Sequence, residues 1–135
     1  MASGTYNAWR EQLMKKTVDM VNDTVKVALY NNSFSFDTTL AAYSTTNELA
    51  TEGGYTQGGV ALANKAVSTA SNKGTFDADD VNWTSATFSA YFALIYDDTT
   101  ATKYPIACID FGGVQTVTGG TFTIQWAATG IITIS

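Results

Sequence analysis

Residues 86–96, ATFSAYFALIY, form the most strand-like stretch of this chain. In a β-strand, side chains point alternately to opposite faces. Both faces of this strand are apolar, because Tyr91 and Ile95 lie opposite the main apolar row. Such a strand is typical of the middle of a sheet, between two layers or packed on a helix. The main apolar row consists of Phe88, Ala90, Phe92, Leu94 and Tyr96.

Turn residues separate further strand-like runs on both sides of this stretch. In the run 24–30, Val25, Val27 and Leu29 share one face, and Lys26 and Tyr30 share the other. Short strands separated by turns, about seven or eight in all, indicate a mainly β fold of the antiparallel β-sandwich or jelly-roll type. The other expected strands are 60–67, 75–84 (interrupted at 77–80), 104–111, 121–126 and 131–134, with glycine pairs at 112–113 and 119–120 bounding a short separate piece.

The N-terminal segment predicts an amphipathic helix over residues 6–16. Tyr6, Trp9 and Leu13 recur at helical spacing and form one apolar stripe. This stripe either covers the sheet of its own domain or docks onto a neighbouring subunit, as large aromatic anchors do at interfaces. The length of 135 residues predicts a single domain, residues 1–135.

Residues 31–59 predict a long irregular loop, because polar residues and Gly53-Gly54 break any regular pattern. Long loops in compact domains often carry binding contacts. Aromatic side chains in this loop either tuck beneath it or form a contact surface. The candidate interface residues are therefore Tyr6, Trp9, Leu13, Phe34, Phe36 and Tyr43.

The charge balance argues against several classes of partner. The net charge is −5, and Lys and Arg number only seven. Binding to nucleic acid requires a basic surface, so we expect no nucleic-acid partner. The first 20 residues contain several charged side chains and no apolar core segment, so we expect no signal peptide, no membrane helix and no membrane partner.

The chain has no histidine and a single cysteine. Ser-His and Cys-His nucleophile pairs and most transition-metal sites are therefore excluded. We expect no catalytic residues, no cofactor and no enzymatic activity. Cys108 lies in the apolar run 105–110 and is predicted to be a buried, unreactive side chain.

A cluster of carboxylates stands at Asp77, Asp79 and Asp80. The spacing does not match an EF-hand loop, because Asn82 occupies the position where glycine is required. Two alternatives remain open: a solvated turn, and an unconventional calcium site completed by Asp97 or Asp98. We assign no metal ligands from the sequence.

Five segments stand out by their order and spacing along the chain: DTVKVALY (23–30), GYTQGG (54–59), FDADDVNWT (76–84), IDFG (109–112) and GTFTIQW (120–126). Together they resemble a group of small structural proteins of tailed bacteriophages. The likeness runs from about Trp9 to the end of the chain.

The resemblance implies a virion component on the capsid surface, of the cement or decoration type, that binds the major capsid protein and reinforces the assembled capsid. Self-association as a dimer or trimer would fit this role. The alternative is a tail, neck or fibre-associated module that recognises a carbohydrate or receptor on the host. The group offers no catalytic residues to carry over.

Overall fold

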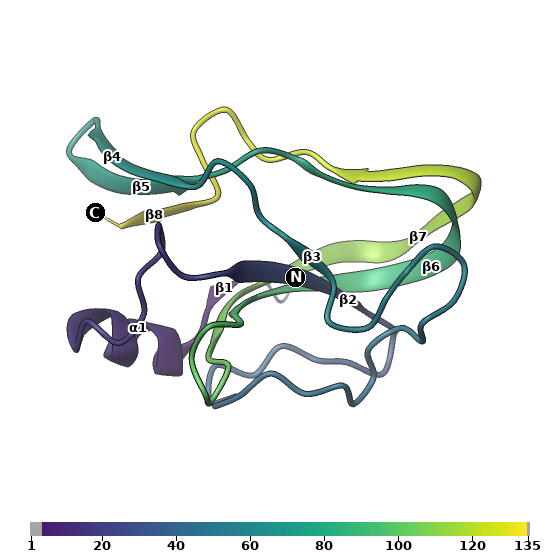
Figure 1. Cartoon of the computed structure of the whole chain (residues 1–135), viewed down its shortest axis with the longest axis horizontal. Helices are drawn as coiled ribbons and strands as arrows, with labels where there is room; N and C mark the ends of the chain where they lie inside the picture. Colours follow the sequence, from purple (N-terminus) through teal and green to yellow (C-terminus); the bar gives the residue numbers. More distant parts are fainter. Residues whose placement is uncertain (1–3, 135) are drawn as a thin grey trace.

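The computed structural model describes residues 4–134, whose strands form two antiparallel sheets and confirm a mainly β fold (Figure 1). One sheet has the strand order β1-β7-β6-β2-β3, and the other has the order β4-β5-β8. The elements are β1 (Gly4–Thr5), α1 (Asn7–Met14), β2 (Val25–Tyr30), β3 (Val60–Ala61), β4 (Ala66–Ala70), β5 (Lys73–Asp77), β6 (Val81–Asp97), β7 (Pro105–Ile124) and β8 (Ile132–Ile134).

Two long strands, β6 and β7, dominate the fold and pair along most of their length. Both bend near the middle, so the half of the hairpin beyond the bend folds back over the half that adjoins the turn at 98–104 (Figure 1). We call residues 91–97 and 105–111 the proximal half, and residues 81–90 and 114–124 the distal half. Only the proximal half pairs with β1 and β2.

The prediction that glycine pairs end the strands was wrong. Gly112 and Gly119 lie inside β7, with φ values of 76° and 61°, in the left-handed region that glycine tolerates. The β6–β7 register shifts near both positions, between Ala90 and Phe92 and on both sides of Ala86. The glycines therefore form bulges that bend one continuous strand, and they do not terminate it.

The first of these bulges also overturns the predicted faces of residues 86–96. Phe92 lies in the same apolar cluster as Leu94 and Tyr96, as predicted. Phe88 and Ala90, however, pack on the opposite side. An extra residue at a bulge exchanges the faces of a strand, because side chains alternate with a period of two.

The prediction of a strand covered on both faces is confirmed for the proximal half of β6. One cluster fills the space between the proximal half and the distal half, and includes Ile95, Trp83 and Val27. A second cluster lies on the other face of the sheet, beneath loop 31–59, and includes Leu94, Tyr96 and Tyr30. Alternate side chains of β2 belong to one or the other of these two clusters, as predicted.

The predicted strand 60–67 was wrong, because two separate strands, β3 and β4, occupy this region. Asn64 interrupts the run with a φ of 54°, which ends regular β structure. A tight turn at Ser71-Asn72, with both φ values positive, then joins β4 to β5. The interruption predicted within 75–84 is confirmed, because β5 ends at Asp77 and β6 begins at Val81.

The N-terminal helix is confirmed, but it is shorter than predicted. Tyr6 is its N-cap and Lys15 its C-cap. Trp9 faces the interior, where its indole N–H donates to the sulfur of Met20 over 3.3 Å. Among residues 4–134, no helix combines the length and the apolar character that crossing a membrane requires.

Candidate interaction surfaces

The aromatic residues predicted from loop 31–59 pack against their own domain. Phe36 lies edge-on to Tyr6, with ring centroids 5.0 Å apart, and Phe34 lies 4.4 Å from Tyr30. Tyr43 stacks on Tyr96 at 4.1 Å. Of the two alternatives for this loop, the structure shows the tucked arrangement. The loop therefore covers one face of the sheet.

The apolar stripe of α1 is also mainly intramolecular. Tyr6 and Trp9 are buried, so both side chains contribute to the interior of their own domain. Leu13 is half-buried, and the neighbouring Met14 is 84% exposed. Docking by this helix thus remains a prediction for its C-terminal end alone.

Leu13 and Met14 line one side of an apolar depression of about 390 Å³. Its other side is β8, where Ile134 is 52% exposed. We call this depression the helix–sheet hollow. The elements α1 and β8, which line it, lie at the end of the molecule opposite the bend of the β6–β7 hairpin (Figure 1). The lining residues are Thr5, Trp9, Arg10, Leu13, Met14, Ile132, Thr133 and Ile134.

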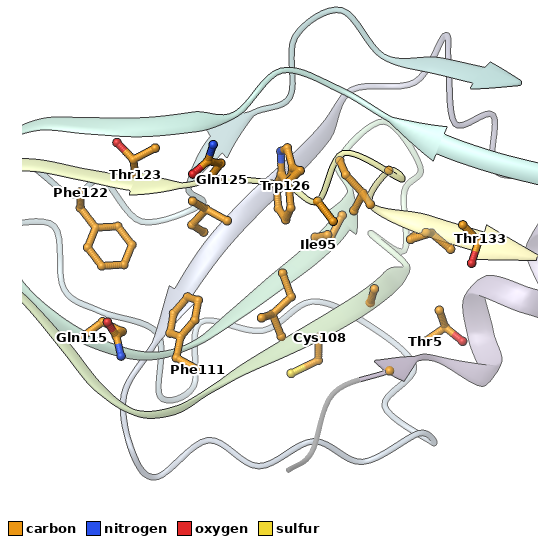
Figure 2. Close-up of a pocket in the computed structure, with 18 residues that line it drawn as sticks. Thr5, Ile95, Cys108, Phe111, Gln115, Phe122, Thr123, Gln125, Trp126 and Thr133 are labelled. Carbon is orange, nitrogen blue, oxygen red and sulfur yellow. The ribbon is translucent and has the colours of Figure 1, made fainter.

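A larger groove of about 790 Å³ opens between the two halves of β7. Figure 2 shows Phe111 from the proximal half and Phe122 from the distal half facing this groove, with Trp126 beside them. The rings of Phe111 and Phe122 are 6.2 Å apart. Gln115 and Gln125 add neutral amides to the lining. We call this site the β7 groove. Sequence reasoning missed it because the groove exists only once β7 bends.

The cluster Asp77, Asp79 and Asp80 has local structural partners. Asp79 accepts a hydrogen bond from the amide of Asn64, and Asp80 accepts one from the backbone N–H of Trp126. The indole N–H of Trp126 donates to the backbone carbonyl of Asp79 over 3.0 Å. Within residues 4–134, no group of three or more potential ligands is placed to hold a metal ion. These contacts fix the segment that follows β7.

Glu48 is a buried carboxylate that sequence reasoning did not single out. Its two oxygens accept hydrogen bonds from the hydroxyls of Tyr43 and Tyr55 and from the backbone N–H of Gly58. The partners are all within ten positions, but they lie in a loop without periodic pattern. These bonds hold the loop together and satisfy the buried charge.

A second buried carboxylate, Asp97, ends β6. Its Oδ1 accepts hydrogen bonds from the N–H groups of Thr99 and Thr100, whereas its Oδ2 is buried without a partner among the described residues. Burial first, and then the nearby Asp23 carboxyl, raise the pKa of Asp97 to about 7. Next to it, burial alone would raise the pKa of Asp98, but Lys103 and Lys26 outweigh burial and lower it.

Cys108 is buried, as predicted from the sequence. Burial raises the pKa of its thiol to about 12. The thiolate form, which is the nucleophile, is therefore scarce at neutral pH.

Comparisons of the chain with models of protein families, with curated proteins and with solved structures found no match.

Proposed function

We propose that this chain is a virion structural protein of a tailed bacteriophage, a cement or decoration protein that binds the major capsid protein at the capsid surface and reinforces the assembled particle. The resemblance of its sequence to small phage structural proteins supports this proposal. A mainly β body with two aromatic-rich clusters supplies the rigid scaffold that such a passive role needs. We also propose that its two sheets belong to a β-sandwich or jelly roll.

The observation that carries the proposal is the helix–sheet hollow. Met14 and Ile134 expose large apolar side chains at its rim. Exposed apolar patches on soluble domains mark interaction surfaces, because removing them from water is favourable. We propose that the hollow receives an apolar side chain of the major capsid protein, and that many copies on symmetry-related sites multiply a modest affinity.

The test is binding of the purified chain to capsids that lack it, followed by heating or osmotic shock of the particles. We expect Met14→Glu to reduce binding at least about tenfold, because it places a charge in an apolar contact. Val21→Glu is the matched control: Val21 is an exposed apolar residue that does not line the hollow. Equal survival of particles with and without the chain would contradict the reinforcing role.

A second candidate function is recognition of a host carbohydrate, and the β7 groove favours it. Ligand sites combine apolar and aromatic surface with a few polar groups. Phe111, Phe122 and Trp126 supply rings, and Gln125 supplies an amide. A glycan array with the native chain and with Gln125→Ala tests this function. Binding of a glycan that the variant loses, together with a low copy number in the particle, would favour it over the capsid role.

A further inference from the structure

The distal half of β7 has one open edge. Strand β7 pairs with β6 on one side, and on its other side it pairs with β1 only at Ala107 and Cys108. Within residues 4–134, no strand pairs with the second edge of β7 between Val114 and Ile124. Bulges flank residues 115–118, which pair with β6 in unbroken register. This segment therefore presents a regular row of backbone groups that a further strand could bind.

The open edge carries none of the charged or proline residues that commonly prevent pairing. Natural proteins guard exposed edge strands with charged residues, especially lysine, or with proline. Residues 111–135 contain neither a charged side chain nor a proline. Val114 is 48% exposed at the start of the segment. An open, uncharged edge of this kind is expected to be paired in the assembled state.

The charge distribution selects a second copy of this chain as the partner. Every charged side chain lies within residues 1–110, and the net charge is −5. Two copies therefore repel each other when their charged parts approach, but not when their β7 edges meet. Antiparallel pairing of two identical strands also satisfies a two-fold axis, so one edge serves both subunits.

Pairing at this edge would bring two β7 grooves together. Gln115 and Phe122 line the groove beside the open edge, and Val117 packs against the adjoining cluster. Thr116 lies on the opposite, outer face, where its hydroxyl is 2.9 Å from that of Ser89 on β6. A second copy would thus extend the sheet at its edge. It would also shield the partly exposed apolar side chains on the face that carries the groove.

We propose that residues 114–118 of β7 pair antiparallel with the same residues of a second copy, forming a two-fold symmetric dimer. The inference deepens the self-association included in the proposed function, and in that respect it rests on that function. It selects a dimer over a trimer, because antiparallel pairing of one edge with itself about a two-fold axis joins two copies.

The experiment is sedimentation velocity of the isolated chain over micromolar to submillimolar concentrations, with two matched variants. Thr116→Lys and Ser89→Lys both remove the hydroxyl–hydroxyl contact and add one positive charge on the same face. Thr116 lies on the β7 edge that is proposed to pair, whereas Ser89 lies on the neighbouring strand β6. We expect the native chain and Ser89→Lys to form dimers, and we expect Thr116→Lys to raise the dimer dissociation constant about tenfold or more, because two lysines then meet across the axis.

Amide hydrogen exchange of the native chain at low and high concentration gives a measurement that needs no variant. We expect slower exchange at residues 114–118 as the dimer population rises with concentration. The exchange rates of residues 66–70 in exposed β4 should stay unchanged. A native monomer, a trimer, a dimer that survives Thr116→Lys, equal dissociation of both variants, or unchanged exchange at 114–118 would each overturn the proposal.

The two proposals fail separately. A monomeric chain that still binds capsids would remove the dimer and leave the capsid role. A dimer that does not bind capsids would remove the capsid role and leave the dimer.

Discussion

The hydroxyl of Tyr55 donates a hydrogen bond of 2.5 Å to the buried carboxylate of Glu48. The same hydroxyl accepts a hydrogen bond of 3.0 Å from the backbone N–H of Leu29 in β2. Glu48 is further held by Tyr43 and Gly58. The side chain of Tyr55 thereby joins loop 31–59 to the five-stranded sheet, and both of its hydrogen bonds are buried.

We predict that Glu48→Gln lowers the free energy of unfolding by about 1–3 kcal/mol, because the amide replaces an acceptor with a donor and leaves at least one buried partner unsatisfied. Urea unfolding at neutral pH measures the change. Glu52→Gln is the control, since Glu52 is an exposed acid of the same loop. Equal effects of the two substitutions would show that the bonds to Glu48 contribute nothing specific.

We predict that Asp97→Asn reduces the loss of stability, measured as the free energy of unfolding, that the native chain undergoes as the pH rises. The pKa of Asp97 is raised to about 7 in the folded state, whereas an aspartate in an unfolded chain titrates near 4. Its contribution to stability is therefore fully present below about pH 4 and is lost as the pH rises through about 7. The asparagine keeps the acceptor for Thr99 and Thr100 without the charge.

The measurement is the difference in free energy of unfolding between Asp97→Asn and the native chain at acidic and mildly alkaline pH. We expect the variant to be more stable than the native chain by about 1–2 kcal/mol at pH 8, and to lose this advantage near pH 4. Asp37→Asn should instead be less stable than the native chain at mildly alkaline pH and should lose this disadvantage at acidic pH. The reason is that hydrogen bonds from Thr39 lower the pKa of Asp37. A difference for Asp97→Asn that does not depend on pH would contradict the prediction.

Local pattern was sufficient to predict some elements of the fold but not the longest ones. Strand β2 was predictable because apolar and polar positions alternate without a break over 25–30. Strands β6 and β7 were not, because a glycine with positive φ looks the same in sequence whether it ends a strand or bends one. The distinction depends on the partner strand, which continues past Gly112 and Gly119.

We predict that Gly59→Ala destabilises the protein far more than Gly119→Ala. Both glycines have positive φ, which costs an alanine about 1–2 kcal/mol. A Cβ at Gly59 would also lie 1.9 Å from the carbonyl oxygen of Val27, whereas a Cβ at Gly119 would meet nothing within 4 Å. We expect Gly59→Ala to cost about 3 kcal/mol or more, and thermal unfolding of both variants measures the difference. Similar losses would mean that loop 31–59 does not press on β2.

The candidate surfaces were harder to predict than the strands, because burial is decided by distant parts of the chain. Tyr6 and Phe36 are both aromatic residues near polar neighbours in the sequence, yet they contact each other in the interior. Met14, in contrast, is exposed because the helix ends there and β8 covers only part of its face. Composition alone distinguishes none of these environments.

We predict that the thiol of Cys108 resists alkylation in the native protein. The side chain is 2% exposed, and burial raises its pKa to about 12, so both access and thiolate concentration are low at pH 8. Labelling with iodoacetamide, followed by mass spectrometry, should be slow in buffer and complete in denaturing urea. Cys108 borders the β7 groove, so rapid labelling of the folded chain would show that the groove opens far enough to admit a small molecule. That result would contradict a rigid scaffold and favour the ligand-binding alternative.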